Sequence, residues 1–452
     1  MLAGSALQTA YAIVNAIWVG NGLGTTAMAA ITVSFPVFFV LMAAAGGLTM
    51  ASSILASQTF GAKDWPQLKR VVQNSVVLTG AASLICISVG HFTAESLLRI
   101  MDTPPEVLPM AASYLRIFLW TMPFMFGLFL IASLLRGTGD SKTPLYFQAV
   151  FLGVTAVLDP LLMFGWLGFP RLGLNGTAVA TIISQAGALI SMLLYLQRKS
   201  HMIAPDWRHL RADWATTWLT LKIGVPSMFQ QAFVSVGMLV IVGLVNAFGR
   251  TGVAAYGAAM RIDQLAFMPA MTVGMAVSTL AGQNIGARHY DRVKEVFRWG
   301  LVFGGGITLL ASLLAVTVPG ILMRMFIQDR AVIELGVQYL RIVGAGYVLF
   351  AVMFVSNGVI NGAGHTFITT LITLVSLWAV RVPLAASLSR SMHRLEGIWF
   401  AVVISFAVGS GISLIYYLSG RWKRPLAGRV LGEVPEQAGA EPMVPFPDAL
   451  VE

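Results

Sequence analysis

A seven-residue pattern occurs twice in this chain, and its recurrence constrains the fold more than any other feature. Residues 56–62 read ASQTFGA and residues 281–287 read AGQNIGA, so Ala, Gln, Gly and Ala recur in register at an offset of 225 residues. One fixed offset over roughly half of the chain indicates an internal duplication. Further identities at this offset are Gly24 with Gly249, Ala29 and Ala30 with Ala254 and Ala255, Tyr114 to Ile117 with Tyr339 to Ile342, and Gly137 and Gly139 with Gly362 and Gly364.

The composition places the chain in a membrane. Of its 452 residues, 57% are hydrophobic and only 11% are charged, whereas a soluble domain has about 25% charged residues. Its apolar runs are close to the ~20 residues that an α-helix needs to cross a bilayer. A transmembrane β-barrel would instead show alternating segments of about ten residues. We therefore expect an all-α polytopic membrane protein.

The apolar runs, bounded by charge, Gly or Pro, predict twelve transmembrane helices, six in each copy of the repeat. An N-terminal lobe (1–197), a cytoplasmic linker (198–214) and a C-terminal lobe (215–420) are expected, followed by a Pro-, Gly- and Glu-rich tail (421–452) that we expect to be disordered. The expected helices are 1–19, 27–56, 71–97, 109–135, 144–166, 174–197, 216–247, 252–281, 292–318, 333–360, 366–389 and 397–419.

The basic residues predict the orientation in the membrane. The loops after the second, fourth, sixth and eighth expected helices, together with the C-terminal tail, hold most of the loop Lys and Arg. Because basic loops stay in the cytoplasm, both termini are expected on the cytoplasmic side of the cell inner (plasma) membrane. The net charge of +10 has the same origin and does not indicate a nucleic-acid partner. The lone Cys86 excludes an intrachain disulfide.

The first helix looks short beside its second copy. At the offset of the repeat Met1 falls on Pro226, yet the second copy of this helix begins near Leu219. We therefore expect a natural start upstream of Met1, and a first helix that is short at its cytoplasmic end.

The even number of helices in each copy gives both lobes the same orientation. Two lobes related by a pseudo-twofold axis along the membrane normal are typical of transporters that rock about a central site. A channel more often assembles identical subunits around a pore, and no filter sequence is visible. Neither a Walker lysine loop nor a clustered set of nucleophile, base or metal ligands occurs, so a membrane enzyme or an ATP-driven pump is disfavoured. The expected driving force is an ion gradient.

Charged residues at membrane depth are functional candidates because they are costly to place there. Asp159 lies inside the fifth expected helix and is followed by Pro160, which removes a backbone donor and is expected to bend the helix. Desolvation disfavours a charged carboxyl group, so Asp159 is a candidate proton-binding site. The alternative is a structural role, in which Asp159 caps a broken helix or pairs with an Arg.

A second interior acid, Asp263, follows Arg261 by two residues. It either pairs locally with Arg261 or faces the central cavity and meets a cation. Arg381, just before Pro383, is an interior base.

Three polar residues of the first helix, Gln8, Tyr11 and Asn15, are three and four positions apart and share one face. They line a cavity in the favoured interpretation. In the other they bond to a neighbouring helix.

A set of motifs occurs in order along the chain: IVNAIWVG, ASQTFGA with its echo AGQNIGA, LLRGTGDSKTP, LDPLLMFGWLG, LNGTAVATIISQ and RIDQLAFMP. Through these motifs the chain resembles the multidrug and toxic compound extrusion (MATE) transporters over nearly its full helical length. The resemblance implies two six-helix lobes around a central V-shaped cavity, a monomer in the lipid bilayer, and export of amphipathic, often cationic small molecules against an inward flow of H⁺ or Na⁺.

The resemblance also implies site residues. It places the cation-coupling carboxylate of the first lobe on Asp159, with Gln8, Tyr11 and Thr177 in the same pocket. The usual Asp of the first helix is Asn15 here, and the usual Asn one turn before the fifth-helix acid is Thr155. One carboxylate in place of two favours H⁺ over Na⁺.

The second lobe departs from the family pattern as well. The seventh and tenth helices, where some members place acids, carry Gln230, Gln231 and Asn357 instead. Asp263 is the remaining coupling candidate in this lobe. The expected ion-coupling residues are thus Asp159, Asn15 and Asp263, and the expected substrate-binding residues are Gln8, Tyr11, Thr155, Thr177, Gln230 and Asn357. A lipid-linked saccharide flippase of the same superfamily is the alternative function.

Overall fold

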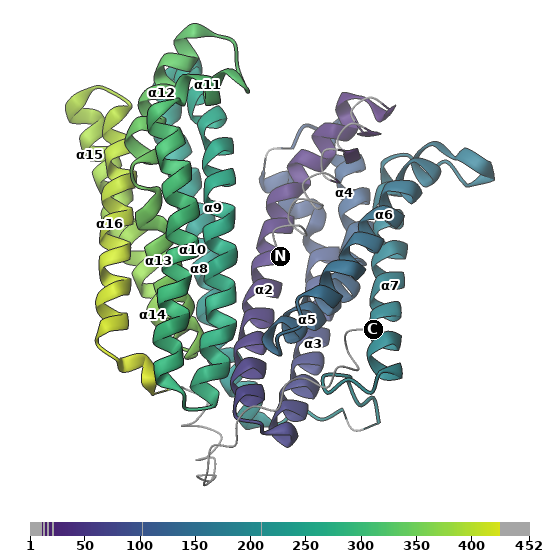
Figure 1. Cartoon of the computed structure of the whole chain (residues 1–452). Helices are drawn as coiled ribbons and strands as arrows, with labels where there is room; N and C mark the ends of the chain where they lie inside the picture. Colours follow the sequence, from purple (N-terminus) through teal and green to yellow (C-terminus); the bar gives the residue numbers. More distant parts are fainter. Residues whose placement is uncertain are drawn as a thin grey trace.

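The computed structural model describes residues 11, 14–15, 18–19, 22–101, 103–208 and 210–424, and these residues form helices joined by short connections (Figure 1). Residues 11, 14–15, 18–19 and 22–23 are helical and precede α2. The N-terminal lobe contains α2 (Thr25–Gly61), α3 (Trp65–Ile100), α4 (Leu108–Leu119), α5 (Met122–Gly137), α6 (Lys142–Phe164), η1 (Trp166–Gly168) and α7 (Leu174–Arg198). The C-terminal lobe contains α8 (Trp214–Asn246), α9 (Gly249–Gly286), α10 (Tyr290–Thr317), α11 (Pro319–Arg324), α12 (Arg330–Gly344), α13 (Tyr347–Gly362), α14 (Thr366–Thr373), η2 (Leu374–Arg381), α15 (Val382–Met392), α16 (Glu396–Leu418) and η3 (Arg421–Lys423).

The predicted all-α fold is confirmed: the described residues form helices and no strand, and these helices make two lobes that diverge from one end (Figure 1). Within the described residues, eight helices are long and apolar enough to cross a membrane singly, and three bent pairs raise the number of spans to 11. The twelve spans predicted from the apolar runs are consistent with this number, because most of the first predicted helix lies outside the described residues.

Two of the three bent spans are divided into separate helices, which the apolar pattern did not predict. The helix expected at 109–135 divides into α4 and α5, bent by 47°. Pro123 lies in the first turn of α5, and a proline there cannot donate a backbone bond to Leu119, the last residue of α4. The helix expected at 333–360 divides into α12 and α13, bent by 45°. Gly344 and Gly346 flank this second break, and glycine weakens a helix.

The helix expected at 366–389 is irregular in its middle. It begins as α14, continues as the π-helical segment η2, and ends as α15. A π-helical segment shifts the side chains that follow it around the helix axis, and such segments often occur at functional sites. Arg381 is the last residue of η2.

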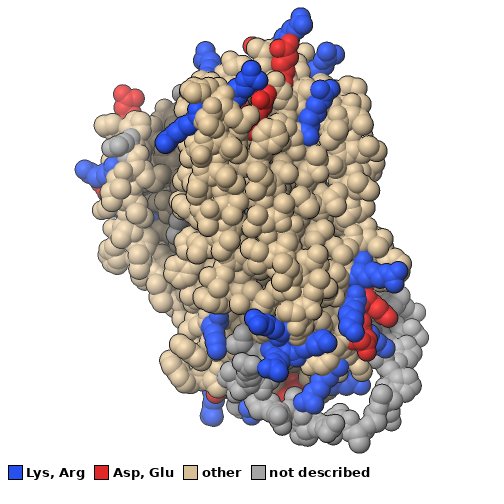
Figure 2. Space-filling model, turned by 90° about the vertical axis from the view of Figure 1, so that its left-hand side faces the viewer, with Lys and Arg blue, Asp and Glu red and all other residues tan. Residues whose placement is uncertain are grey.

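The surface is sorted by charge. Lys and Arg gather at the two ends of the bundle, and the band between them on the visible face is almost free of charge (Figure 2). Large apolar side chains of α10, among them Phe303, Leu309 and Leu310, are each 60% exposed. Such a surface is suited to contact with lipid tails.

The two lobes meet at one end and diverge toward the other (Figure 1). They meet where α2 and α9 finish, and α2 contacts both α8 and α9. The linker between α7 and α8 lies at this same end. Beyond α16, the first residues of the expected disordered tail form the turn η3, in which Trp422 is buried and donates to the carbonyl of Tyr417 (2.8 Å). The tail beyond residue 424 lies outside the described residues.

Candidate functional site

The acid of the first lobe, Asp159, is completely buried on α6. Its Oδ2 atom accepts hydrogen bonds from the Tyr11 hydroxyl (2.9 Å) and from Asn15 Nδ2 (2.8 Å). Its other oxygen, Oδ1, is buried and has no hydrogen-bond partner among the described residues. Three of the predicted site residues therefore meet, and the carboxyl group keeps one oxygen able to take up a proton or a cation.

Pro160 shapes the end of this helix but does not break it. α6 continues through Pro160 and ends one turn later at Phe164, where Gly165 takes the left-handed conformation (φ 76°). A proline in the last turn removes only one bond of the helix, and the bend expected at Pro160 stays a prediction. Asp159 is consequently held in regular helix, one turn from its end.

The other predicted members of this pocket are held by their own helices. Thr155 is fully buried and donates to the carbonyl of Phe151 (2.8 Å), and Thr177 is buried and donates to the carbonyl of Leu174 (2.9 Å). Gln8 lies outside the described residues. A role of these three side chains in substrate binding stays a prediction.

The acid of the second lobe, Asp263, is buried on α9 among phenol groups. The Tyr347 hydroxyl donates to its Oδ1 (2.6 Å), and the Tyr339 hydroxyl donates to its Oδ2. Tyr339 is on α12 and Tyr347 is on α13, so the carboxyl group joins the two sides of the break. Local pairing with Arg261 is wrong, because Arg261 is exposed while Asp263 is buried and already bonded.

The two acids occupy positions that the repeat does not relate. At the offset of 225 the first-lobe counterpart of Asp263 is Phe38, whose ring lies 6.2 Å from that of Tyr114. Tyr114 is itself the counterpart of Tyr339. The tyrosine is therefore common to both lobes and the acid beside it is particular to the second. Sequence reasoning missed Tyr339 as a partner of Asp263, although its place in the repeated YLRI segment distinguishes it.

Arg381 is fixed near this cluster without a direct ion pair to Asp263. Its Nε donates to the Ser405 hydroxyl (2.7 Å), and its guanidinium lies over the ring of Phe406, 4.8 Å from the centroid. Both partners belong to α16. The predicted interior base therefore ties η2 to α16 inside the second lobe.

Two further predicted residues make contacts between helices of the second lobe. Gln230 on α8 donates to the Thr373 hydroxyl (2.8 Å), and Asn357 on α13 accepts from the Ser413 hydroxyl (2.9 Å). Neither hydrogen bond reaches Asp159 or Asp263. Their role in substrate binding stays a prediction.

Two hydrogen bonds between the lobes are related by the repeat. Gln58 Nε2 on α2 donates to the carbonyl of Gly362 at the end of α13 (2.6 Å). Gln283 Nε2 on α9 donates to the carbonyl of Gly137 at the end of α5 (2.8 Å). The offset of 225 that relates the two glutamines also relates the two glycines. The repeated sequence pattern therefore forms a pseudo-symmetric contact between the lobes.

Two more glycines let the lobe backbones touch at the same place. A Cβ atom on Gly61 would overlap the carbonyl oxygen of Gln283, and a Cβ atom on Gly286 would overlap that of Gln58. These glycines are again counterparts in the repeat. The interlobe clasp, as we call it, consists of Gln58, Gly61, Gly137, Gln283, Gly286 and Gly362. The repeat was the signal for these residues, although sequence reasoning did not place them between the lobes.

Comparison with known proteins identifies relatives over nearly the whole chain. The MatE family model matches residues 1–161 and residues 226–386, two segments related by the same offset as the sequence repeat. The probable multidrug resistance protein YoeA of Bacillus subtilis (strain 168) is 33% identical over 440 residues, which cover 95% of this chain and 94% of the relative. The probable multidrug resistance protein YpnP of the same organism is 33% identical over 423 residues, with 94% of each chain covered.

Solved structures share the fold. The crystal structure of MATE in the bent conformation matches with a TM-score of 0.86 at 22% identity, covering 93% of this chain and 92% of that chain. The outward-facing conformation of a multidrug resistance MATE family transporter of the MOP superfamily matches with a TM-score of 0.84 at 23% identity, covering 93% of both chains.

Proposed function

The chain belongs to the MATE family of membrane transporters, and on this premise we propose that it exports amphipathic, in particular cationic, small molecules in exchange for protons. Its relatives are named as probable multidrug resistance proteins, which supports the proposed substrate class. In the proposed orientation the clasp closes the cytoplasmic end, and the V opens to the outside. The basic loops at the clasped end support this orientation.

One observation carries the proposed coupling: Asp159 has one oxygen bonded twice and the other without a partner among the described residues. A carboxylate held in that way is costly inside a membrane protein. Binding a proton at Oδ1 removes the charge and leaves both hydrogen bonds to Oδ2 in place. Tyr11 and Asn15 then orient the group in both protonation states.

The interlobe clasp supports transport by rocking of the two lobes. A substrate can leave the cytoplasm only when this end opens, so both glutamine bonds have to break once in every cycle. Each neutral hydrogen bond contributes about 0.5–1.5 kcal/mol, which stabilises the outward-open form without locking it. Proton and substrate move this equilibrium only through different affinities for the two forms. Competition between proton and substrate for a site at or near Asp159 supplies that difference in affinity.

Reconstituted vesicles test the choice of coupling ion. With the purified protein in lipid vesicles, a proton gradient imposed at equal Na⁺ should drive transport of a fluorescent organic cation. A sodium gradient imposed at uniform pH should drive none, because one carboxylate with neutral Tyr11 and Asn15 offers Na⁺ fewer charged ligands than the two carboxylates expected in the family. The measurement is the initial rate of dye movement under each gradient.

A sodium-driven rate equal to the proton-driven rate would contradict proton coupling. Movement of a lipid-linked saccharide in place of the dye would instead favour the flippase alternative.

The second-lobe acid, Asp263, is proposed as a further protonation site, because it is buried and, among the described residues, accepts hydrogen bonds only from neutral hydroxyl groups. Replacing Tyr347 by Phe should leave Oδ1 of Asp263 buried without a donor, at a cost of about 1–3 kcal/mol. Thermal unfolding in detergent measures the loss. In an Asp263→Leu background the same change should cost much less, because no oxygen is left unsatisfied. Equal losses in both backgrounds would show that Tyr347 acts by packing alone.

A further inference from the structure

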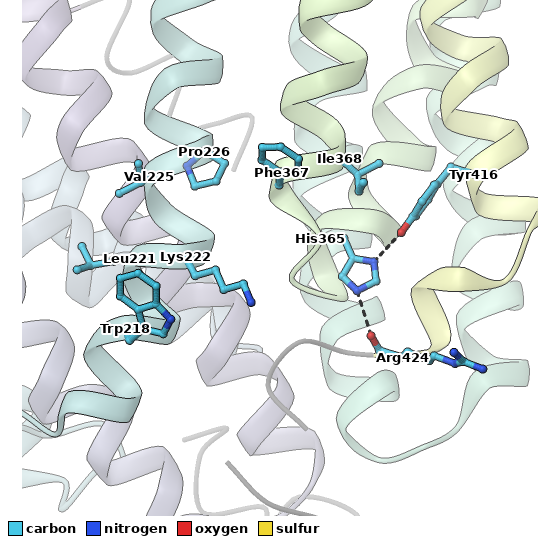
Figure 3. A pocket seen from close by; sticks show the side chains of 10 residues that line it. All are labelled: Trp218, Leu221, Lys222, Val225, Pro226, His365, Phe367, Ile368, Tyr416 and Arg424. Carbon is cyan, nitrogen blue, oxygen red and sulfur yellow. Dashed lines mark hydrogen bonds between the residues drawn. The ribbon is translucent and has the colours of Figure 1, made fainter. Parts of the chain in front are cut away.

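A cavity of about 710 Å³ lies in the second lobe between α8, α14 and α16, near the clasped end of the bundle (Figure 3). It is separate from both acid sites, and the proposed transport cycle does not use it. It is lined by Trp218, Leu221, Lys222, Val225, Pro226, His365, Phe367, Ile368, Tyr416 and Arg424.

One side of the cavity is polar and fixed. The His365 ring bonds to the Tyr416 hydroxyl through Nδ1 (2.9 Å) and to the Arg424 carbonyl through Nε2 (3.0 Å). From the opposite side, the Lys222 side chain extends from α8 toward His365 (Figure 3). Lys222 is exposed and forms no ion pair with any described residue. Arg421 and Lys423, beside Arg424, are also exposed. The cavity is thus lined by the positively charged Lys222 side chain, and the basic residues that follow α16 lie next to it.

The other side is apolar and open. Trp218 is 55% exposed, Phe367 is 59% exposed, and Val225 also shows a substantial part of its surface. Lys222 follows the first residue of α8 by eight positions, which at 1.5 Å per residue places it about 12 Å along the helix. In the proposed orientation this position lies toward the cytoplasmic side of the membrane, where anionic headgroups are found. An anion with apolar chains fits both sides of the cavity.

We propose that this cavity binds an anionic phospholipid of the cytoplasmic leaflet, with its phosphate at Lys222 and its acyl chains against Phe367 and Val225. Basic cavities between transmembrane helices on the cytoplasmic side suit such headgroups. The positive charge opposes an organic cation, so the cavity is not a second site for the proposed cargo. The site is particular to this lobe, because the repeat counterpart of His365 is Asp140. Lipid binding at this site requires the predicted orientation in the membrane but does not depend on transport.

Lipid binding to the purified full-length protein tests the inference. Phosphatidylglycerol should raise the thermal unfolding midpoint more than phosphatidylcholine does, and millimolar inorganic phosphate should not reproduce the effect. Lys222→Gln should weaken phosphatidylglycerol binding about fivefold, since one basic residue near an anionic surface contributes about 1 kcal/mol. Native mass spectrometry measures the affinity. Lys222→Arg should retain binding.

The control is Lys69→Gln, which removes an exposed lysine of α3 near the same end of the bundle. It should bind phosphatidylglycerol as the unaltered protein does. Unfolding in phosphatidylcholine reports whether each variant folds. Unchanged phosphatidylglycerol affinity in folded Lys222→Gln overturns the inference. So does equal stabilisation by inorganic phosphate, which would indicate a small-anion site.

Discussion

The Asp159→Asn variant should fold normally and lose proton-driven efflux down to the level of empty vesicles. An Asn side chain can place its amide oxygen where Oδ2 lies and keep both donors, Tyr11 and Asn15. Its amide nitrogen then takes the place of Oδ1, which makes no hydrogen bond to any described residue. The shape of the site survives while the proton-binding group is gone. The measurement is dye efflux from vesicles as a function of the imposed pH difference.

The matched control is Asp291→Asn, since the Asp291 side chain is 93% exposed and pairs with Lys294 at the surface. An exposed pair of this kind contributes little, so efflux and its pH dependence should be unchanged. Binding of the dye to Asp159→Asn, measured without a gradient, separates loss of coupling from loss of the cavity. Efflux by Asp159→Asn that still follows the pH difference would leave Asp159 without its proposed role.

The Gly286→Ala variant should wedge the lobes apart at the clasp and abolish or severely slow efflux. The added methyl group would overlap the carbonyl oxygen of Gln58, and because that atom belongs to the backbone it cannot move aside alone. The outward-open form would then no longer be closed at its cytoplasmic end. Gly61→Ala should act in the same way, since its methyl group would meet the backbone of Gln283.

The control is Gly257→Ala on the same helix, where an added Cβ meets nothing within 4 Å. Alanine favours a helix over glycine by roughly 1 kcal/mol, so this variant should transport normally. Spin labels at Lys63→Cys and Arg288→Cys, in a Cys86→Ser background, report the separation of the lobes. They should move apart in Gly286→Ala and not in Gly257→Ala. An unchanged separation with normal efflux would show that the clasp tolerates the methyl group.

For the polar cluster of the first lobe, the resemblance predicted more of the contacts with Asp159 than the pattern did. Spacing alone placed Gln8, Tyr11 and Asn15 on one face, and it left open whether that face lines a cavity or bonds to a neighbouring helix. The structure shows that Tyr11 and Asn15 bond to Asp159, which lies far away in sequence on α6. That pairing depends on how two helices are rotated against each other, and no local signal carries it.

The second lobe was harder to predict for the same reason. The neighbouring charge in sequence, Arg261, was the visible partner for Asp263, but on a helix a residue two positions away points to another side. The actual partners, Tyr339 and Tyr347, come from two helices that the apolar pattern merged into one. A break at glycines leaves hydropathy unchanged, so the pattern could not reveal it.

The sequence by itself determined that the chain forms membrane-spanning helices in two lobes of one orientation, in a number consistent with the spans that the structure describes. It did so because each crossing requires an apolar run of fixed length, and because duplication leaves an offset that can be read directly. Only the tertiary structure decided which polar groups meet inside the lobes, and that Gln58 and Gln283 join the lobes to each other. Those contacts depend on helix rotation, on breaks and on close approach of backbones, none of which changes the apolar pattern.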